Sequence, residues 1–151
     1  MTQTKPVINI AILGSPIICE GFKSMIAPYD NLVITIETSN GQILFDLAQA
    51  VTIVPDICIL DIDITDVQHN NIARQIKQNW PSIKILAVSI NRLESTVSAV
   101  LQNPIVGYLP QYLNKKDIYN ALLAVYEKRH YHLHITSSEL IEKFMLTFSK
   151  N

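Results

Sequence analysis

The chain has little of several features that define whole classes of protein. Its 151 residues include only two cysteines, Cys19 and Cys58, which lie far apart and form no CxxC or His-spaced pattern. This excludes a disulfide framework, does not suggest a zinc site, and fits a reducing cytoplasm, where we expect the protein to be. Charge is scarce as well: Lys and Arg number 12, Asp and Glu 13, and the formal net charge is -1. We therefore expect no nucleic-acid-binding or acidic-membrane-binding surface on this chain.

Long hydrophobic runs are also missing. The first apolar stretch, residues 7–19, is interrupted by Asn9, Gly14, Ser15 and Pro16, and is too short to span a bilayer. It predicts a buried strand, not a signal or a membrane span. Apolar residues make up 48% of the chain and charged residues 17%, below the ~25% of a typical soluble domain. This excludes disorder and indicates a partner or a self-interface.

What the sequence does contain is a regular alternation of strand and helix patterns, which suits a single domain of ordinary size. Five apolar strand runs each precede a helical pattern, and the strands are expected at 7–13, 33–37, 56–60, 83–89 and 106–109. The helices are expected from Ser15 and Pro16 to about residue 28, around 43–51, 72–80 and 97–101, and over 115–129. Such alternation predicts a doubly wound α/β fold, with a five-stranded parallel sheet and helices on both faces.

A different pattern follows residue 129. Three histidines alternate at 130, 132 and 134, which on a strand could share a face and bind a metal, although an exposed loop is the explanation we prefer. Thr136 to Glu139 then resembles a capping box and opens an extra C-terminal helix. Its apolar stripe, which we expect to pack on its own domain or on a second copy, consists of Leu140, Ile141, Phe144, Met145 and Phe148. We divide the chain into a domain at 1–133 and a linker helix at 134–151.

The residues that end the strands are the best candidates for a site, because ligands of doubly wound sheets bind at the carboxyl ends of the strands. Asp61 is the one carboxylate that directly ends the central strand. It could be a nucleophile, a metal ligand or a structural cap, and the residues alone leave these three open.

Three segments together give a resemblance to a known family. They are Pro-Ile-Ile-Cys-Glu-Gly-Phe at 16–22, Pro-Asp-Ile-Cys-Ile-Leu-Asp at 55–61 and Gly-Tyr-Leu at 107–109. They resemble the receiver domains of response regulators, and within these the NarL/LuxR-type regulators, which normally also carry a helix-turn-helix domain. The resemblance covers about residues 7–133 and implies a flavodoxin-like or CheY-like fold in two-component signal transduction and transcription regulation.

The resemblance implies that part of the phosphorylation site is retained. Asp61 matches the phosphoacceptor aspartate. Ser89 matches the hydroxyl residue that contacts the phosphoryl group, and Tyr108 matches the aromatic residue that moves inward when that hydroxyl is engaged.

Other parts of that site are replaced. The acidic pair that holds Mg²⁺ in the family is Leu13 and Gly14 here, and the lysine after the fifth strand is Gln111. Phosphoryl transfer to a carboxylate depends on cations that neutralise the negative charge, and Mg²⁺ requires several oxygen ligands. With Asp61 as the main ligand and Asp63 as the only nearby acid that could help, we expect weak Mg²⁺ binding or none.

Two further groupings have structural explanations that we prefer. Gly14 and Ser15, which precede a helix, could hold a phosphate on free amides, but helix capping explains them. Asp66 and His69 could form an acid-base pair, but we interpret them as surface residues of a loop.

We therefore expect an atypical receiver domain with no enzymatic activity, which regulates through protein contacts without ordinary Mg²⁺-dependent phosphorylation. The expected partners are a second copy or another protein, through the last two helices around Tyr119, Tyr126 and Phe144, and a sensor kinase if phosphorylation persists. DNA would be contacted only by a domain that this chain lacks, and no membrane is involved.

One alternative is a receiver phosphorylated on Asp61 with a weakened metal site. The other is a small flavodoxin-like protein that binds a nucleotide or phosphate.

Overall fold

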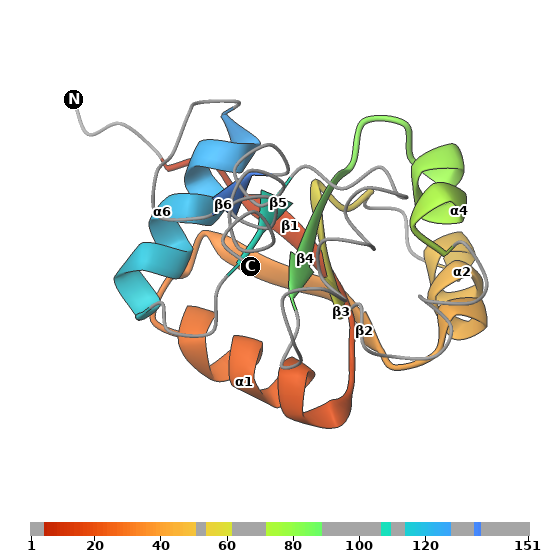
Figure 1. Cartoon of the computed structure of the whole chain (residues 1–151), viewed down its shortest axis with the longest axis horizontal. Coiled ribbons are helices and arrows are strands. Elements are labelled where there is room, and N and C mark those ends of the chain that lie inside the picture. Colours follow the sequence, from red (N-terminus) through yellow and green to blue (C-terminus); the bar gives the residue numbers. More distant parts are fainter. Residues whose placement is uncertain are drawn as a thin grey trace, which may run out of the picture.

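The structure is a computed structural model that describes residues 5–50, 54–61, 72–88, 107–109, 114–127 and 135–136. Figure 1 shows the arrangement of the elements along the chain. They are β1 (Ile8–Leu13), α1 (Pro16–Ile26), β2 (Leu32–Thr38), α2 (Gly41–Ala50), β3 (Ile57–Asp61), α4 (Ile72–Asn79), β4 (Lys84–Val88), β5 (Gly107–Tyr108), α6 (Lys115–Tyr126) and β6 (Ile135–Thr136). The helices predicted around 97–101 and after Thr136 lie outside the described residues.

The strands form one sheet in the order β2-β1-β3-β4-β5-β6. β2, β1, β3 and β4 are parallel to one another, which confirms the α/β class and the parallel arrangement predicted for these strands. β5 adds two residues in parallel to β4. β6 pairs with β5 in the antiparallel direction. This corrects the prediction at Thr136, which the capping-box pattern places at the start of a helix and which the structure places in a strand.

Both faces of the sheet are covered, because the strands are apolar at nearly every position. Side chains of β1 and β3 alternate between two buried clusters, so that Ile12 and Ile59 face one side while Leu13 and Leu60 face the other. The first cluster contacts α1 and α6, and the second contacts α2 and α4. Figure 1 shows these two helix pairs on opposite sides of the sheet, as a doubly wound fold requires.

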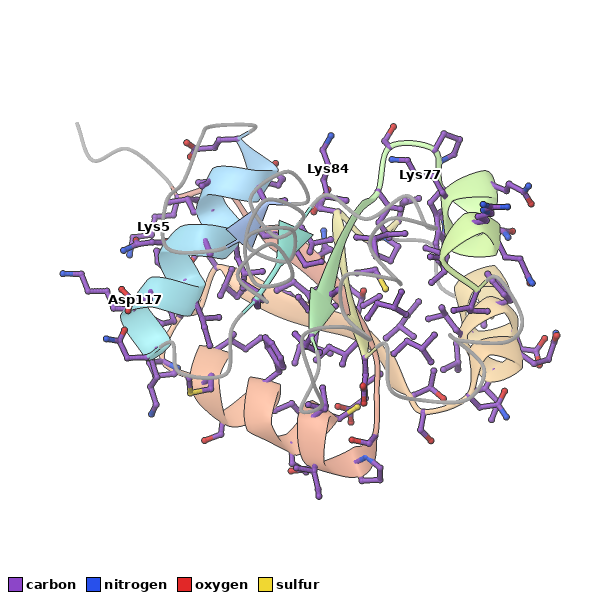
Figure 2. The ribbon with its side chains drawn as sticks, in the orientation of Figure 1. Lys5, Lys77, Lys84 and Asp117 are labelled. Atoms are coloured by element: carbon purple, nitrogen blue, oxygen red, sulfur yellow. The ribbon has the colours of Figure 1, made fainter. Side chains whose placement is uncertain are left out.

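The helix starts are fixed by the side chains that the sequence offers as caps. Ser15 is the N-cap of α1, and its Oγ accepts a hydrogen bond from the Ile18 amide at 3.4 Å. Asn114 caps α6 in the same way, with its Oδ1 accepting from the amide of Asp117, which Figure 2 labels near the start of α6, at 2.8 Å. The prediction that Ser15 is a cap is confirmed. None of the helices in the described part of the chain is long and apolar enough to cross a membrane.

Tyr119 of α6 is held by contacts within its own domain. Its ring stacks on that of Tyr29, with 4.2 Å between ring centroids, and its hydroxyl accepts a hydrogen bond from Asn31 Nδ2 at 3.1 Å. The same Asn31 nitrogen donates to the carbonyl of Pro6 at 3.1 Å. Tyr119 therefore joins α6 to the connection between α1 and β2. That it also belongs to an association surface stays a prediction.

Candidate functional site

The carboxyl ends of β1, β3 and β4 meet at one edge of the sheet, where parallel strands of this fold place their ligand sites. Leu13 ends β1 and Asp61 ends β3, and the ladder pairs Asp61 with Val88 at the end of β4. Asp61 is only 3% exposed. The structure therefore places the predicted phosphoacceptor at the expected edge, but as a buried side chain.

A hydrogen bond holds Asp61 against the loop between β1 and α1. The Ser15 amide donates to Asp61 Oδ2 at 3.1 Å. The other polar groups of this loop are also used: the Gly14 amide donates to the Thr38 carbonyl at 3.0 Å, and the Cys19 thiol donates to the Gly14 carbonyl at 3.5 Å. The amides of Gly14 and Ser15, which a bound phosphate would need, already have protein acceptors. This contradicts the phosphate-cradle alternative at Gly14 and Ser15.

Position 14 lies directly beside Asp61, and neighbouring atoms crowd it. A Cβ added to Gly14 would be 3.3 Å from the Asp61 Cβ and only 2.9 Å from Ile18 Cγ2. The second distance is closer than ordinary carbon contacts allow, and Ile18 Cγ2 branches directly from its own Cβ, so Ile18 cannot simply swing its end away. A side chain at position 14 therefore requires a shift of Ile18 or of the start of α1.

Leu13 has a packing role. It is fully buried in the cluster that α2 and α4 cover, together with Leu60. Because side chains alternate along β3, Asp61 lies on the opposite face of the sheet from Leu60. The side chain at position 13 is thus part of the apolar core.

The described residues are a poor fit to the Mg²⁺ site that the family resemblance implies. Asp61 supplies a carboxylate, but positions 13 and 14 supply no side-chain oxygen, and Ile18 fills the space beside Gly14. Within the residues that the structure describes, no group of three His, Cys, Asp or Glu side chains is placed to hold a metal ion. Mg²⁺ prefers six oxygen ligands near octahedral geometry. Among Leu13, Gly14 and Asp61, Asp61 alone supplies a carboxylate, so water would have to provide most of the remaining ligands.

Several predicted site residues lie outside the described part of the chain. They are Asp63, Ser89 and Gln111, together with Asp66, His69, His130, His132 and His134. Tyr108 is described through its backbone, which belongs to β5. The roles predicted for these residues stay predictions.

A small acidic cavity of about 210 Å³ adjoins the same loop, and the sequence analysis did not identify it. Lys23 Nζ lies 2.7 Å from Glu20 Oε1 and 3.0 Å from Glu37 Oε1. The hydrogen bonds that Lys23 donates to these carboxylates, the one to Glu20 first, raise the pKa of Lys23, so it stays a cation shared by two acids. Burial, followed by the charge of Glu37, raises the pKa of the Cys19 thiol, which stays neutral. The cavity is lined by Gly14, Pro16, Cys19, Glu20, Glu37, Thr38 and Ser39.

Ile18 is the residue whose importance sequence reasoning missed. Ile18 packs on the apolar side of α1, and it also crowds position 14. The available signal was its position: Ile18 stands in the first turn of the predicted helix, four residues after Gly14, so the helix start folds back over that glycine.

Comparison with known proteins identifies the family and the fold. The sequence profile of the family described as "Response regulator receiver domain" matches residues 14–123. The nitrate/nitrite response regulator protein NarL of Escherichia coli K12 is 24% identical over 122 residues, which are 81% of this chain and 56% of NarL. The transcriptional regulatory protein DegU of Brevibacillus brevis is 26% identical over 106 residues, 70% of this chain and 44% of DegU. The chain thus spans about half the length of these two regulators.

Solved structures of similar fold include RcsB of Salmonella. A structure of the RcsB response regulator from Salmonella typhimurium superposes with a TM-score of 0.72 at 20% identity, covering 92% of this chain and 68% of RcsB. The isolated REC domain of RcsB from Salmonella enterica serovar Typhimurium, solved with the phosphomimetic BeF3-, gives a TM-score of 0.66 at 19% identity, covering 82% of this chain and 91% of that domain. At these identities the likeness concerns the fold.

Proposed function

The chain belongs to the response regulator receiver domain family, and from that premise we propose that it is the receiver part of a NarL/LuxR-type transcriptional regulator that works without ordinary Mg²⁺-dependent phosphorylation. Such a module is a signalling domain of the cytoplasm, not an enzyme, and acts through contacts with a second copy or another protein. DNA would be bound by a separate domain. The matches to NarL and DegU, which this chain spans in part, support that assignment.

The observation that carries the proposal is the closed arrangement around Asp61. One of its carboxylate oxygens accepts a hydrogen bond from the Ser15 amide. The adjacent position 14 carries no acid, and Ile18 occupies the space that a side chain there would need. Transfer of a phosphoryl group to a carboxylate brings negative charges together, and a cation beside the acceptor normally offsets them. In the proposed function, Asp61 instead ties β3 to the start of α1.

A phosphorylation assay with acetyl phosphate tests this proposal. The wild-type chain is incubated with the phosphodonor, with and without Mg²⁺, and its intact mass is measured over time. We expect the wild type to behave like the Asp61→Asn variant, with no Mg²⁺-dependent adduct. The matched positive control is Gly14→Asp combined with Ile18→Ala, which restores an acid and makes room for it.

The phosphorylatable receiver is the second candidate, because Asp61 ends the central strand where a phosphoacceptor belongs. In that case a sensor kinase would be the partner, and Asp63 would assist the metal. A Mg²⁺-dependent adduct on the wild type that is absent from Asp61→Asn would establish this candidate and overturn the first.

A further inference from the structure

The structure has a second cavity, at the end of the sheet opposite Asp61, with a volume of about 370 Å³. Asp56 directly precedes β3, Lys84 begins β4, and Tyr126 ends α6. Figure 2 shows Lys84 at the end of the sheet where β4 begins. The ligand sites of this fold lie at the carboxyl ends of the strands, so the cavity is separate from the site at Asp61. The residues that line it are Asp56, Pro81, Ser82, Lys84 and Tyr126.

Three of the lining side chains offer hydrogen-bond donors that are not used within the described part of the chain. They are the ammonium of Lys84 and the hydroxyls of Ser82 and Tyr126. Lys84 and Tyr126 are half-buried, and the Lys84 amide donates to the Asp56 carbonyl at 3.0 Å, which fixes this wall of the cavity. Polar groups in such positions usually bond to an acceptor. A ligand that carries anionic oxygens meets all three donors in one cavity.

The charge at this end of the sheet also favours an anionic group. Lys77 Nζ donates to the Ile83 carbonyl at 2.6 Å, and burial, followed by the charge of Lys84, lowers the pKa of Lys77. Figure 2 shows the two lysines at the same end of the sheet. Neither ammonium forms an ion pair with a carboxylate of the described residues. An anion beside Lys84 would therefore reduce the repulsion between two cations.

Asp56 adds a carboxylate to the same wall. Its Oδ2 accepts a hydrogen bond from the Asn9 amide at 2.8 Å, which fixes the side chain against β1. Among the described residues no ion pair joins Asp56 to Lys84, so the cavity presents both a negative and a positive group. A carboxylate can accept several hydrogen bonds, and its charge repels a second anionic group. The wall therefore suits a ligand that carries one negative and one positive charge.

We propose that this cavity binds a free α-amino acid. The carboxylate of the ligand accepts hydrogen bonds from Lys84, Ser82 and Tyr126. Its ammonium group donates to Asp56. The cavity is at the small end of the range of ~300–1,000 Å³ that is usual for small-molecule sites, which agrees with a ligand of this size. Because Tyr126 ends α6, binding would join that helix to the starts of β3 and β4. The inference goes beyond the proposed function and holds whether or not Asp61 is phosphorylated.

A titration of the full chain followed by ¹H–¹⁵N NMR tests the proposal. Each of the common protein amino acids is added in turn at millimolar concentration. We expect at least one of them to give saturable shifts at the amides of residues 56, 82, 84 and 126. The matched control ligands are the same compound without its amino group and the same compound without its α-carboxylate, and each should bind at least tenfold more weakly. Absence of saturable shifts at these amides with every amino acid, or equally tight binding of either control ligand, would overturn the proposal.

Variants of the cavity wall locate the bound ligand. Lys84→Met removes the ammonium, and Asp56→Asn removes the negative charge but keeps an acceptor for the Asn9 amide. Each should weaken binding at least tenfold, whereas Lys84→Arg, which keeps a cation, should weaken it less. The control is Lys115→Met, which removes the same charge from an exposed lysine at the other end of α6 and should bind as the wild type does. If Lys84→Met binds the amino acid as tightly as Lys115→Met, the ligand lies outside this cavity and the proposal is wrong.

Discussion

The backbone amide of Ser15 donates a hydrogen bond to Asp61 Oδ2 at 3.1 Å, and this bond joins the start of α1 to the end of β3. The first turn of α1 contains no acidic residue of its own. A carboxylate near a helix N-terminus interacts favourably with the partial positive charge there. Asp61 therefore supplies, from a neighbouring strand, the negative charge that the helix sequence lacks.

Substitution of Asp61 separates its structural contribution from its charge. Asp61→Ala removes the acceptor and leaves the partly buried Ser15 amide without it, which should lower the free energy of unfolding by about 1–3 kcal/mol. Asp61→Asn keeps an oxygen acceptor of the same shape, and should cost about 1 kcal/mol or less. Urea denaturation measures both values. If the alanine variant is as stable as the wild type, the bond to Ser15 does not hold α1 to β3.

Position 14 should accept an acid only after Ile18 is shortened. Gly14→Asp alone forces its Cβ against Ile18 Cγ2, and an overpacked contact of this kind costs about 1–3 kcal/mol. Ile18→Ala removes Cγ2, the nearest obstructing carbon, and leaves the Ile18 Cβ at 3.2 Å, a tight contact that a shift of a few tenths of an ångström relieves. The double variant should therefore lose less stability than the sum of the two single changes, and it should bind Mg²⁺ at least tenfold more tightly than the wild type. Thermal unfolding and Mg²⁺ titration check the two expectations. Additive losses with unchanged metal binding would show that Ile18 is not the obstacle.

The fold was predictable for those strands and helices whose own residues carry a recognisable pattern, such as an apolar run or a capping residue. The run from Ile8 to Leu13 is apolar at almost every position because helices cover both of its faces, and such a run identifies a central parallel strand without further information. Ser15 followed by Pro16 identified the start of α1 for the same local reason. β6 could not be predicted, because two residues carry no period and its partner, β5, is far away in the sequence.

The candidate site was predictable in its residue types but not in its geometry. The absence of acids at positions 13 and 14 is visible in the sequence. That Leu13 belongs to the core under α2 and α4, and that Ile18 blocks position 14, depends on which side chains the folded chain brings together. The sequence therefore predicted that positions 13 and 14 carry no acid. The structure adds that Leu13 packs in the apolar core and that Ile18 crowds position 14.

Leu13→Asp should be far more damaging than a loss of one apolar contact. The change removes a fully buried leucine, worth about 1.5–3 kcal/mol, and places a carboxylate among apolar side chains of the core. We expect a total loss above about 4 kcal/mol, or failure to fold at 37 °C. Leu13→Met, which conserves volume, should cost less than about 1.5 kcal/mol. Denaturant titration of the pair decides the matter, since similar stabilities for the two variants would mean that position 13 is open to water.

The buried thiol of Cys58 should make the domain lose stability in alkaline solution. Burial raises the pKa of Cys58 from 9.0 to about 12, because the thiolate cannot be solvated inside the core. In the unfolded chain the thiol ionises with its ordinary pKa. The contribution of the neutral thiol is therefore fully present below pH 9 and is lost as the pH rises toward 12, with a slope of up to about 1.4 kcal/mol per pH unit.

The Cys58→Ala variant isolates this effect, because it keeps the other groups that titrate in the same range. The difference in unfolding free energy between wild type and variant should be constant from pH 7 to about 8.5, and should then shrink steadily as the pH rises, since only the wild type carries the buried thiol. Urea denaturation at a series of pH values gives this difference directly. The variant will be less stable at neutral pH, because it leaves a small cavity, but that cost does not depend on pH. A difference that stays constant up to pH 11 would show that the thiol of Cys58 ionises as easily in the folded protein as in the unfolded chain.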